Sequence, residues 1–215
     1  RVEIFLRGLH PERVELDDVR GALTDRFFEE IPEGGGGGSI RDVFPDPAEV
    51  PSLLLNGGMF EVSLSKIFRA DRPQTVTLGT LRLVPLGGYW VHVEADLESP
   101  LLGRWTVRGE ADLDTGALRL RIETDRPLWI TPELREALAP ALQGVYDRYL
   151  PGGVCDIRVR VDQEAGGRPA VSVTLLARDM TLTYRPFPYP VTDAQGEIEF
   201  RADGFRVKDM RARHG

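Results

Sequence analysis

The sequence is poor in the residues that carry most enzyme chemistry. It has a single cysteine, Cys155, and three histidines, His10, His92 and His214. One cysteine excludes a disulfide within the chain, and no further motif joins the histidines to a nucleophile and an orienting carboxylate. His92 and Glu94 share one side of an alternating segment, but no third metal ligand clusters with them. We therefore expect a protein that is not an enzyme, with no metal site and no cofactor.

The chain also lacks a basic excess and a long apolar run. Lys and Arg number 27 against 34 Asp and Glu, which gives a net charge of −7. This charge offers no long-range attraction for a phosphate backbone, so nucleic acid is not an expected partner. No run approaches the roughly 20 apolar residues that span a bilayer, and no signal peptide is visible. Because the chain begins at Arg1, inside the alternation Val2–Leu6, we interpret it as a segment of a longer protein.

The clearest structural signal is a helix that leads into a strand. Thr131 is suited to cap a helix and Pro132 to begin it. The spacing of apolar residues predicts a helix over 132–148 with one face for burial: Leu134, Leu138, Leu142, Val145 and Tyr149. Pro151-Gly152-Gly153 ends it, and the period then changes to two, with Cys155, Ile157, Val159 and Val161 alternating with charged residues. Such a strand has one apolar and one solvated face and is typical of antiparallel sheets.

Most of the remaining chain also alternates with a period of two. We predict about ten amphipathic strands, and a hairpin formed by residues 2–7 and 13–16. Only short helices are predicted besides 132–148, one over 24–31 and one over 48–54. Residues 34–38 are all glycine, which is the composition of a flexible, engineered linker, with a natural glycine-rich loop as the alternative.

Several segments resemble one another along the chain. Leu55–Phe68 and Leu150–Gln163 both begin with leucine, a turn former and two glycines before an alternating strand. Gly109–Leu120 resembles Gly196–Val207, since each has a glycine-glutamate start and a hairpin turn. These matches predict a repeat of roughly 90 residues.

A third match suggests where the repeats begin and end. Arg206–Arg213 echoes Arg13–Gly21. We therefore divide the chain into the end of a preceding repeat, the linker, and two repeats: residues 1–33, 34–39, 40–130 and 131–215.

The fold must hide or use the apolar side of these strands. One or two short helices cover little of such a sheet, so the sheet either closes on itself, packs on a second sheet or holds an apolar ligand. The sequence predicts a mainly β fold, a curled antiparallel amphipathic sheet that forms an elongated open groove with one or two short covering helices. A closed β-sandwich or barrel is the alternative.

Three features together resemble a known family. The helix-PGG-strand unit, the segment VRGEADLDTGALRLRI and the segment VTDAQGEIEFRADGFRVKDMRA are similar to the AsmA-like and TamB-like proteins of bacterial envelopes, a group of repeating β-groove, bridge-like lipid-transfer proteins. The resemblance covers about Leu55 to His214. It implies a periplasmic groove, part of an inner-membrane-anchored protein, that moves phospholipids between the inner and outer membranes and supports outer-membrane biogenesis.

The resemblance and the alternation together nominate the residues that line the groove. They are Leu64, Leu81, Leu83, Val91, Val93, Trp105, Val107, Leu118, Leu120, Ile122, Ile157, Val159, Val173, Leu175, Ile198 and Phe200. The expected ligand is a phospholipid or another acyl-chain lipid, and helix 132–148 is expected to shield one stretch of the groove. A non-enzymatic β-sandwich scaffold or binding module of the cell envelope is the alternative function, in which the same residues form an ordinary core.

Overall fold

The strands of the chain form one sheet. The computed structural model describes residues 12–24, 40–63, 65, 67–201 and 204–214. Among these residues eleven strands run in the order β1-β2-β3-β4-β5-β6-β8-β9-β10-β11, with β7 paired to β8. Their bounds are β1 Arg13–Thr24, β2 Ser52–Ser63, β3 Gln74–Gly87, β4 Trp90–Ser99, β5 Gly103–Asp112, β6 Leu118–Thr124, β7 Leu128–Ile130, β8 Gly152–Gln163, β9 Ala170–Tyr184, β10 Phe187–Arg201 and β11 Gly204–His214.

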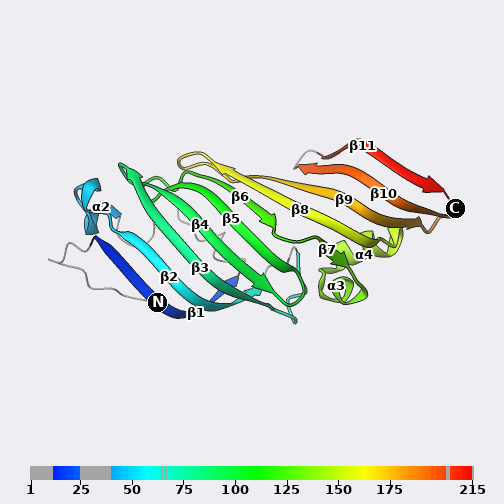
Figure 1. Ribbon diagram of the computed structural model, residues 1–215, viewed down its shortest axis with the longest axis horizontal. Coiled ribbons are helices and arrows are strands. Elements are labelled where there is room, and N and C mark those ends of the chain that lie inside the picture. Colours follow the sequence, from blue (N-terminus) through cyan, green and yellow to red (C-terminus); the bar gives the residue numbers. More distant parts are fainter. Residues whose placement is uncertain (1–11, 25–39, 64, 66, 202–203, 215) are drawn as a thin grey trace.

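The sheet is open. Strands β1 and β11 lie at opposite ends of the elongated molecule (Figure 1), and no described residue of one pairs with the other. The predicted curled open sheet with short helices is therefore confirmed, and the alternative of a closed sandwich or barrel is wrong. One detail of the prediction needs correction, because β1 and β2 run parallel while the other pairs are antiparallel. The sheet is mixed.

Alternation along the strands gives the sheet two different faces. Directly opposed residues of neighbouring strands lie on the same face. Val107 lies opposite Ile122, and Ile122 lies opposite Val159, so their apolar side chains gather on one side. Arg108 lies opposite Arg121 and therefore points to the other side. We call these two surfaces the apolar face and the charged face.

Extra residues bend the sheet along two lines. Near the beginning, Asp18 of β1 and Gly57 of β2 have positive φ angles of 51° and 73° and are both left out of the strand register. Near the end, Asp193 of β10 and Asp209 of β11 have φ angles of 50° and 49°, close to register shifts in their strands. Such bulges bend a strand and increase its twist. They give the sheet its curl.

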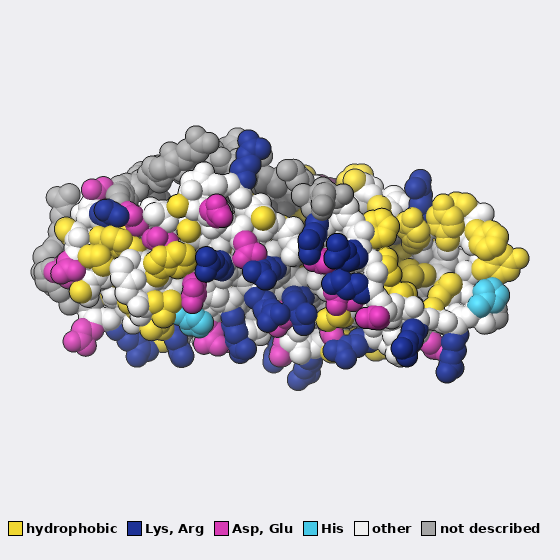
Figure 2. Space-filling model, turned by 90° about the horizontal axis from the view of Figure 1, so that it is seen from above, with side chains coloured by type: hydrophobic (Ala, Val, Ile, Leu, Met, Phe, Trp, Pro, Cys, Tyr) yellow, Lys and Arg dark blue, Asp and Glu magenta, His cyan; other side chains and the backbone are white. Residues whose placement is uncertain are grey.

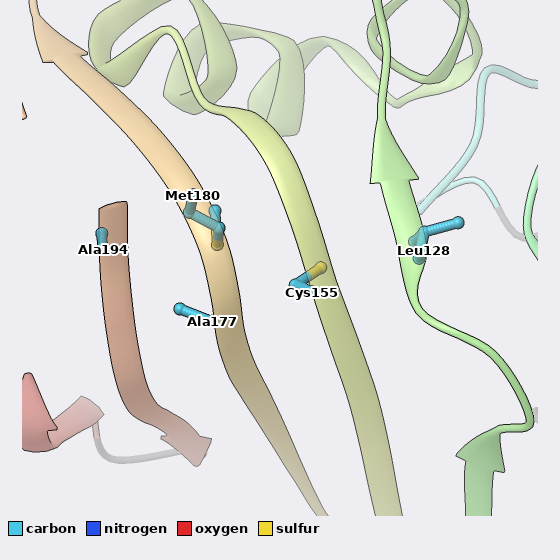
Figure 3. Packing of buried hydrophobic residues seen from close by; sticks show 5 residues of the cluster. All are labelled: Leu128, Cys155, Ala177, Met180 and Ala194. Carbon is cyan, nitrogen blue, oxygen red and sulfur yellow. The ribbon is translucent and has the colours of Figure 1, made fainter. Parts of the chain in front are cut away.

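Small buried residues lie beside these bends. One cluster consists of Leu128, Cys155, Ala177, Met180 and Ala194, which come from the neighbouring strands β7 to β10 (Figure 3). The other consists of Leu55, Leu78, Ala95 and Val107 in β2 to β5. Each cluster buries its members against side chains of the neighbouring strands.

The helix predicted over 132–148 is two helices. Helix α3 spans Pro132–Ala137 and α4 spans Pro140–Tyr149. Pro140 is the cause, because proline pushes the preceding residue out of helical geometry, and Ala139 indeed has an extended ψ of 151°. Thr131 caps α3 as predicted, by accepting a hydrogen bond from the Leu134 N–H. Both helices lie near the lower ends of β7, β8 and β9 in Figure 1.

The apolar stripe predicted for this helix is largely not buried. Its last three members are exposed in α4, with Val145 at 55%. The break at Pro140 changes the direction of the chain, so a stripe calculated for one continuous helix no longer faces one surface. The prediction that one face of this helix is buried is therefore wrong for α4.

The segment before β2 forms a clamp over the β3–β4 turn. It contains α2 (Ile40–Val43) and a single 3₁₀ turn, Pro47–Glu49, so the helix predicted over 48–54 is wrong and residues 52–54 belong to β2. Phe44 and Val50 are buried against Tyr89. The Tyr89 hydroxyl donates to the Phe44 carbonyl at 2.8 Å, which holds the clamp in place.

A second connection joins the two halves of the sheet. Phe68, in the link between β2 and β3, forms a bridge with Leu138 between α3 and α4. The Arg69 N–H donates to the Ala137 carbonyl, and the Ala139 N–H donates to the Ile67 carbonyl, both at 2.9 Å. Phe68, Ala137 and Ala139 are all buried. This strap ties the early strands to the helices that precede β8.

Two predictions fall on the beginning of the chain. Residues 2–7 of the predicted hairpin, and residues 25–31 of the predicted helix 24–31, lie outside the described residues. Residues 13–16 are extended as predicted, but the strand does not end there. It continues through Asp17 and Asp18 to Thr24.

Candidate functional site: the apolar face

One unbroken row of apolar residues crosses the whole sheet. Each member lies directly opposite the next in the neighbouring strand, from β1 to β11. We call it the apolar row: Leu16, Leu55, Leu81, Ala95, Val107, Ile122, Val159, Val173, Phe200 and Phe205. Because opposed residues share a face, the row is a continuous surface and not a set of separate patches.

The nominated lining residues lie on this face. Leu81, Val107, Ile122, Val159, Val173 and Phe200 are in the apolar row itself. The other described candidates each lie opposite an apolar-face residue of a neighbouring strand. They are Leu83, Val91, Val93, Trp105, Leu118, Leu120, Ile157, Leu175 and Ile198. Leu64 lies outside the described residues. The strand register thus brings all the described candidates together on one side of the sheet.

Their burial differs along the sheet. Val91 has an exposed side chain fraction of only 1% and Val107 of 9%, so both behave as core. Leu120, Ile122 and Val159 are half-buried. Phe200, near the last strand, is 44% exposed. The middle and the end of the apolar face therefore present hydrocarbon surface to their surroundings, while part of the beginning does not.

Sequence reasoning missed an aromatic group at the C-terminal end of this face. Tyr184 of β9 stacks on Tyr149 of α4 with ring centroids 5.3 Å apart. Phe187 and Tyr189 of β10 lie 4.5 Å apart, and Tyr189 lies 5.3 Å from His214. Figure 2 shows hydrophobic side chains bordering a hollowed region at the end where β9 to β11 lie. The sequence signal is the group Tyr184, Phe187 and Tyr189, in which Phe187 and Tyr189 occupy alternate positions.

The only cysteine is not a reactive group. Cys155 is completely buried among Leu128, Ala177 and Met180. Burial in apolar surroundings raises the pKa of its thiol to about 11, because the charged thiolate would lose its hydration. Near neutral pH the thiol is therefore protonated and packs as a small apolar side chain.

The charged face carries arginines in line. Arg108, Arg121 and Arg160 lie directly opposite one another in β5, β6 and β8. They border an open hollow of about 720 Å³, and Figure 2 shows Lys and Arg gathered over the middle of the molecule. Carboxylates offset their repulsion, since Arg160 lies 2.7 Å from Asp162 and the other two have partners at 3.2–3.4 Å.

These pairs are exposed and contribute little to stability. They do keep this face charged and solvated. His92 lies on this face opposite Glu110. Among the described residues no group of three His, Cys, Asp or Glu side chains is placed to hold a metal ion.

Comparison with known proteins gives no relative: no protein-family model, curated protein or solved structure matches the chain. The resemblance to the AsmA-like and TamB-like proteins therefore stays a prediction. The geometry of the two faces is the remaining evidence about function.

Proposed function

We propose that the chain binds the acyl chains of phospholipids along its apolar face and passes them along the sheet. The observation that carries this proposal is the apolar row, which runs without interruption from β1 to β11 on a sheet that does not close. A protein that uses such residues only as core would need a second layer over them. The described helices, α2, α3 and α4, are short and lie at the ends of strands.

The barrier to moving a lipid through water is the cost of exposing its acyl chain, which a hydrocarbon-lined trough lowers without a catalytic group. Exposing an acyl chain to water costs about 0.8 kcal/mol for each CH₂, or on the order of 10 kcal/mol for roughly 16 carbons. The half-buried leucine, isoleucine and valine side chains in the middle of the face offer an acyl chain hydrocarbon contact there. No covalent step is needed, because the lipid only changes position. The charged face opposite keeps the sheet in contact with water.

The cellular setting belongs to the same proposal. If the family resemblance holds, the groove lies in the periplasm as part of an inner-membrane-anchored protein and carries phospholipids between the inner and outer membranes. The described residues include no helix of the length and hydrophobicity that crossing a bilayer requires. The proposal is supported by the open apolar face and by the sequence resemblance.

The first test is the lipid content of the purified protein. Native mass spectrometry followed by organic extraction is expected to detect co-purifying phospholipid. The protein is also expected to take up a fluorescent acyl-chain probe. A lipid-free protein that takes up no probe contradicts the proposal and leaves the scaffold or binding-module interpretation.

The second test places charge on the apolar face. The double variant Leu120→Asp, Val159→Asp adds two carboxylates to the middle of the face, where both side chains are half-buried. We expect at least a tenfold loss of probe uptake with a β-rich circular dichroism spectrum retained. The matched control, Arg119→Asp with Arg160→Asp, changes the same two strands on the charged face and is expected to keep uptake. Equal uptake by both variants contradicts the groove.

A further inference from the structure

In the part of the chain that the structure describes, no strand is paired to the outer edge of β11. Among the residues that the structure describes, β11 pairs with β10 alone. Its apolar-face residues are open, with Phe205 exposed by 70% and Val207 by 48%. An edge strand with free backbone groups and exposed apolar side chains is a template for a further strand. The question is which kind of strand fits.

Strand β1 has the same local structure as β11. Asp18 in β1 has a φ of 51° and Asp209 in β11 has a φ of 49°. A non-glycine residue in this region is uncommon and marks a defined bulge. In β1 an apolar residue follows the aspartate directly, and in β11 Met210 does the same. When Asp209 is matched with Asp18, Val207 takes the place of Leu16. This match differs by two residues from the one that pairs Arg206 with Arg13.

The partner of β1 shows what this bulge requires. Strand β2 runs parallel to β1, with Asp17 opposite Asn56 and Val19 opposite Gly58. Asp18 and Gly57 are therefore both extra residues. One extra residue in one strand alone would turn the following apolar side chains of its neighbour to the wrong face. The neighbour must carry its own extra residue, and Gly57, at a φ of 73°, supplies it.

The second glycine is needed for space. A Cβ atom at Gly58 would lie 2.8 Å from the Val19 carbonyl oxygen, which is closer than such atoms approach. A strand that pairs with this kind of bulge therefore carries two glycines after a polar residue, as in Leu55-Asn56-Gly57-Gly58. Any longer side chain at the second position would push the strands apart.

We propose that the outer edge of β11 binds, in parallel, an extended segment of the β2 type supplied by a partner protein. The segment has an apolar residue, a polar residue and two glycines, followed by alternating apolar residues. Placed as β2 is placed on β1, its Leu53 and Leu55 equivalents cover Phe205 and Val207. Its second glycine lies opposite Met210. The backbone pairing adds a strand to the sheet, and the pairs of apolar residues fix its register.

Strand β6 offers a competing comparison, and the bulge decides against it. The sequence likens the β10–β11 hairpin to the β5–β6 hairpin, and β6 is followed by an antiparallel neighbour, β8. The β6–β8 pairing, however, has no register shift, and β6 contains no residue with positive φ. A β8-type strand has no extra residue to match Asp209, so its apolar side chains would turn to the charged face beyond that point. Of these two comparisons, only the parallel β2-type partner, which carries its own extra residue, matches the edge.

Charge supports the same partner. The charged-face side chains of β11 are basic: Arg206, Lys208, Arg211 and Arg213. In β2, Glu61 lies opposite Ala22 of β1. The same register on β11 places the Glu61 equivalent opposite Arg213, whose guanidinium lies 3.4 Å from the Asp193 carboxylate. An acidic residue three positions after the second glycine is therefore a feature of the expected segment.

The test uses a labelled peptide with the β2 sequence, Ser52–Ser63, and a solubilising tail. Fluorescence anisotropy with the intact, lipid-free chain is expected to show saturable binding. A Gly58→Val peptide is expected to bind at least tenfold more weakly. In the protein, Phe205→Lys is expected to weaken binding at least tenfold. The matched control is Trp129→Lys, at a side chain exposed to 67% in β7, a strand that pairs with β8, and it is expected to leave binding unchanged.

A crosslink fixes the direction. A photoreactive group in place of Leu55 of the peptide is expected to label the segment around Val207, as the parallel register requires. Equal binding of the two peptides overturns the proposal, and so does labelling near His214 or outside β11. Self-association of the chain that Phe205→Lys abolishes, without peptide binding, assigns the edge to a second copy and also overturns it. None of these outcomes depends on lipid uptake.

Discussion

The two halves of the sheet use the same alternation for different purposes. In the first half, β2 to β6, the apolar face is closed in places: Val91 and Leu78 are almost fully buried, and the clamp around Tyr89 covers the β3–β4 turn. In the second half, β8 to β11, the buried cluster is confined to the bend beside Cys155. Val171, Phe200 and Phe205 remain exposed on the same face.

The difference shows what a period-two pattern can and cannot tell. Alternation decides which side of a sheet a residue faces, and it did so correctly in both halves. Burial depends on what lies over that side, which is set by connections such as the clamp and the strap. We infer that the first half is the stable base and that the second half is the more accessible part of the apolar face. The following predictions test this contrast.

The largest effect is expected from a charge in the first half. Val91→Asp places a carboxylate at a side chain exposed by 1%, without a partner, and is expected to cost about 3–5 kcal/mol of unfolding free energy or to prevent folding. Val171→Asp makes the same change on the same face in the second half, where the side chain is 46% exposed. It is expected to cost less than about 1 kcal/mol. Urea denaturation of both variants compares the halves directly, and equal losses would remove the contrast.

The next effect is expected at the strap. Phe68→Ala removes a buried aromatic ring that packs where the β2–β3 link meets α3 and α4, and we expect a loss of about 3–4 kcal/mol. The strap joins the halves, so hydrogen exchange should rise at both Phe68 and Ala139. Ile67→Ala, at a neighbouring side chain exposed by 44%, is the control and is expected to lose less than about 1 kcal/mol. Faster exchange in the first half alone would show that the strap does not couple the halves.

The sequence predicted the sheet better than its connections. Strands such as β8 can be recognised in the sequence because Ile157, Arg158 and Val159 alternate between apolar and charged. The side of the sheet to which each residue points follows from this local pattern. The parallel placement of β1 against β2 was not visible, because residues distant along the chain decide it. The break at Pro140 is encoded locally, because proline interrupts a helix, whereas the apolar stripe taken alone predicts one continuous helix.

The candidate site was predictable as a surface but not in its detail. The register needed to align Val107, Ile122 and Val159 across neighbouring strands follows from hairpins and bulges that no single segment encodes. The burial of Val91, which is core, cannot be distinguished in the sequence from that of Val159, which is half-buried. Both valines lie at apolar positions of an alternating strand. The aromatic residues between 184 and 189, at the end of β9 and the start of β10, are a local sequence signal for the aromatic end of this face.

A smaller effect concerns the buried thiol of the second half. Because burial raises the pKa of Cys155 to about 11, its thiolate fraction at pH 8 is about a hundredfold below that of a free thiol. We expect alkylation by iodoacetamide to be at least that much slower in the folded chain than in urea. The protonated thiol stabilises the fold fully below the unfolded pKa, near 9, and this contribution is lost as the pH rises toward 11. Rapid labelling at pH 8 would show that the bend opens readily.

The smallest effect is expected where α3 meets α4. Arg135 donates two hydrogen bonds of 2.6 Å to the Asp147 carboxylate, and this pairing holds the pKa of Asp147 below its usual range. A lowered carboxyl pKa stabilises the fold above the unfolded pKa and loses that contribution as the pH falls through the folded value. We expect Asp147→Asn to lower the melting temperature slightly at pH 7 and to match the parent chain at pH 2. Because α4 borders the exposed half through Tyr149 and Tyr184, a larger loss at pH 7, accompanied by faster exchange in β9, would mean that the helix pair supports the second half of the groove rather than only its own geometry.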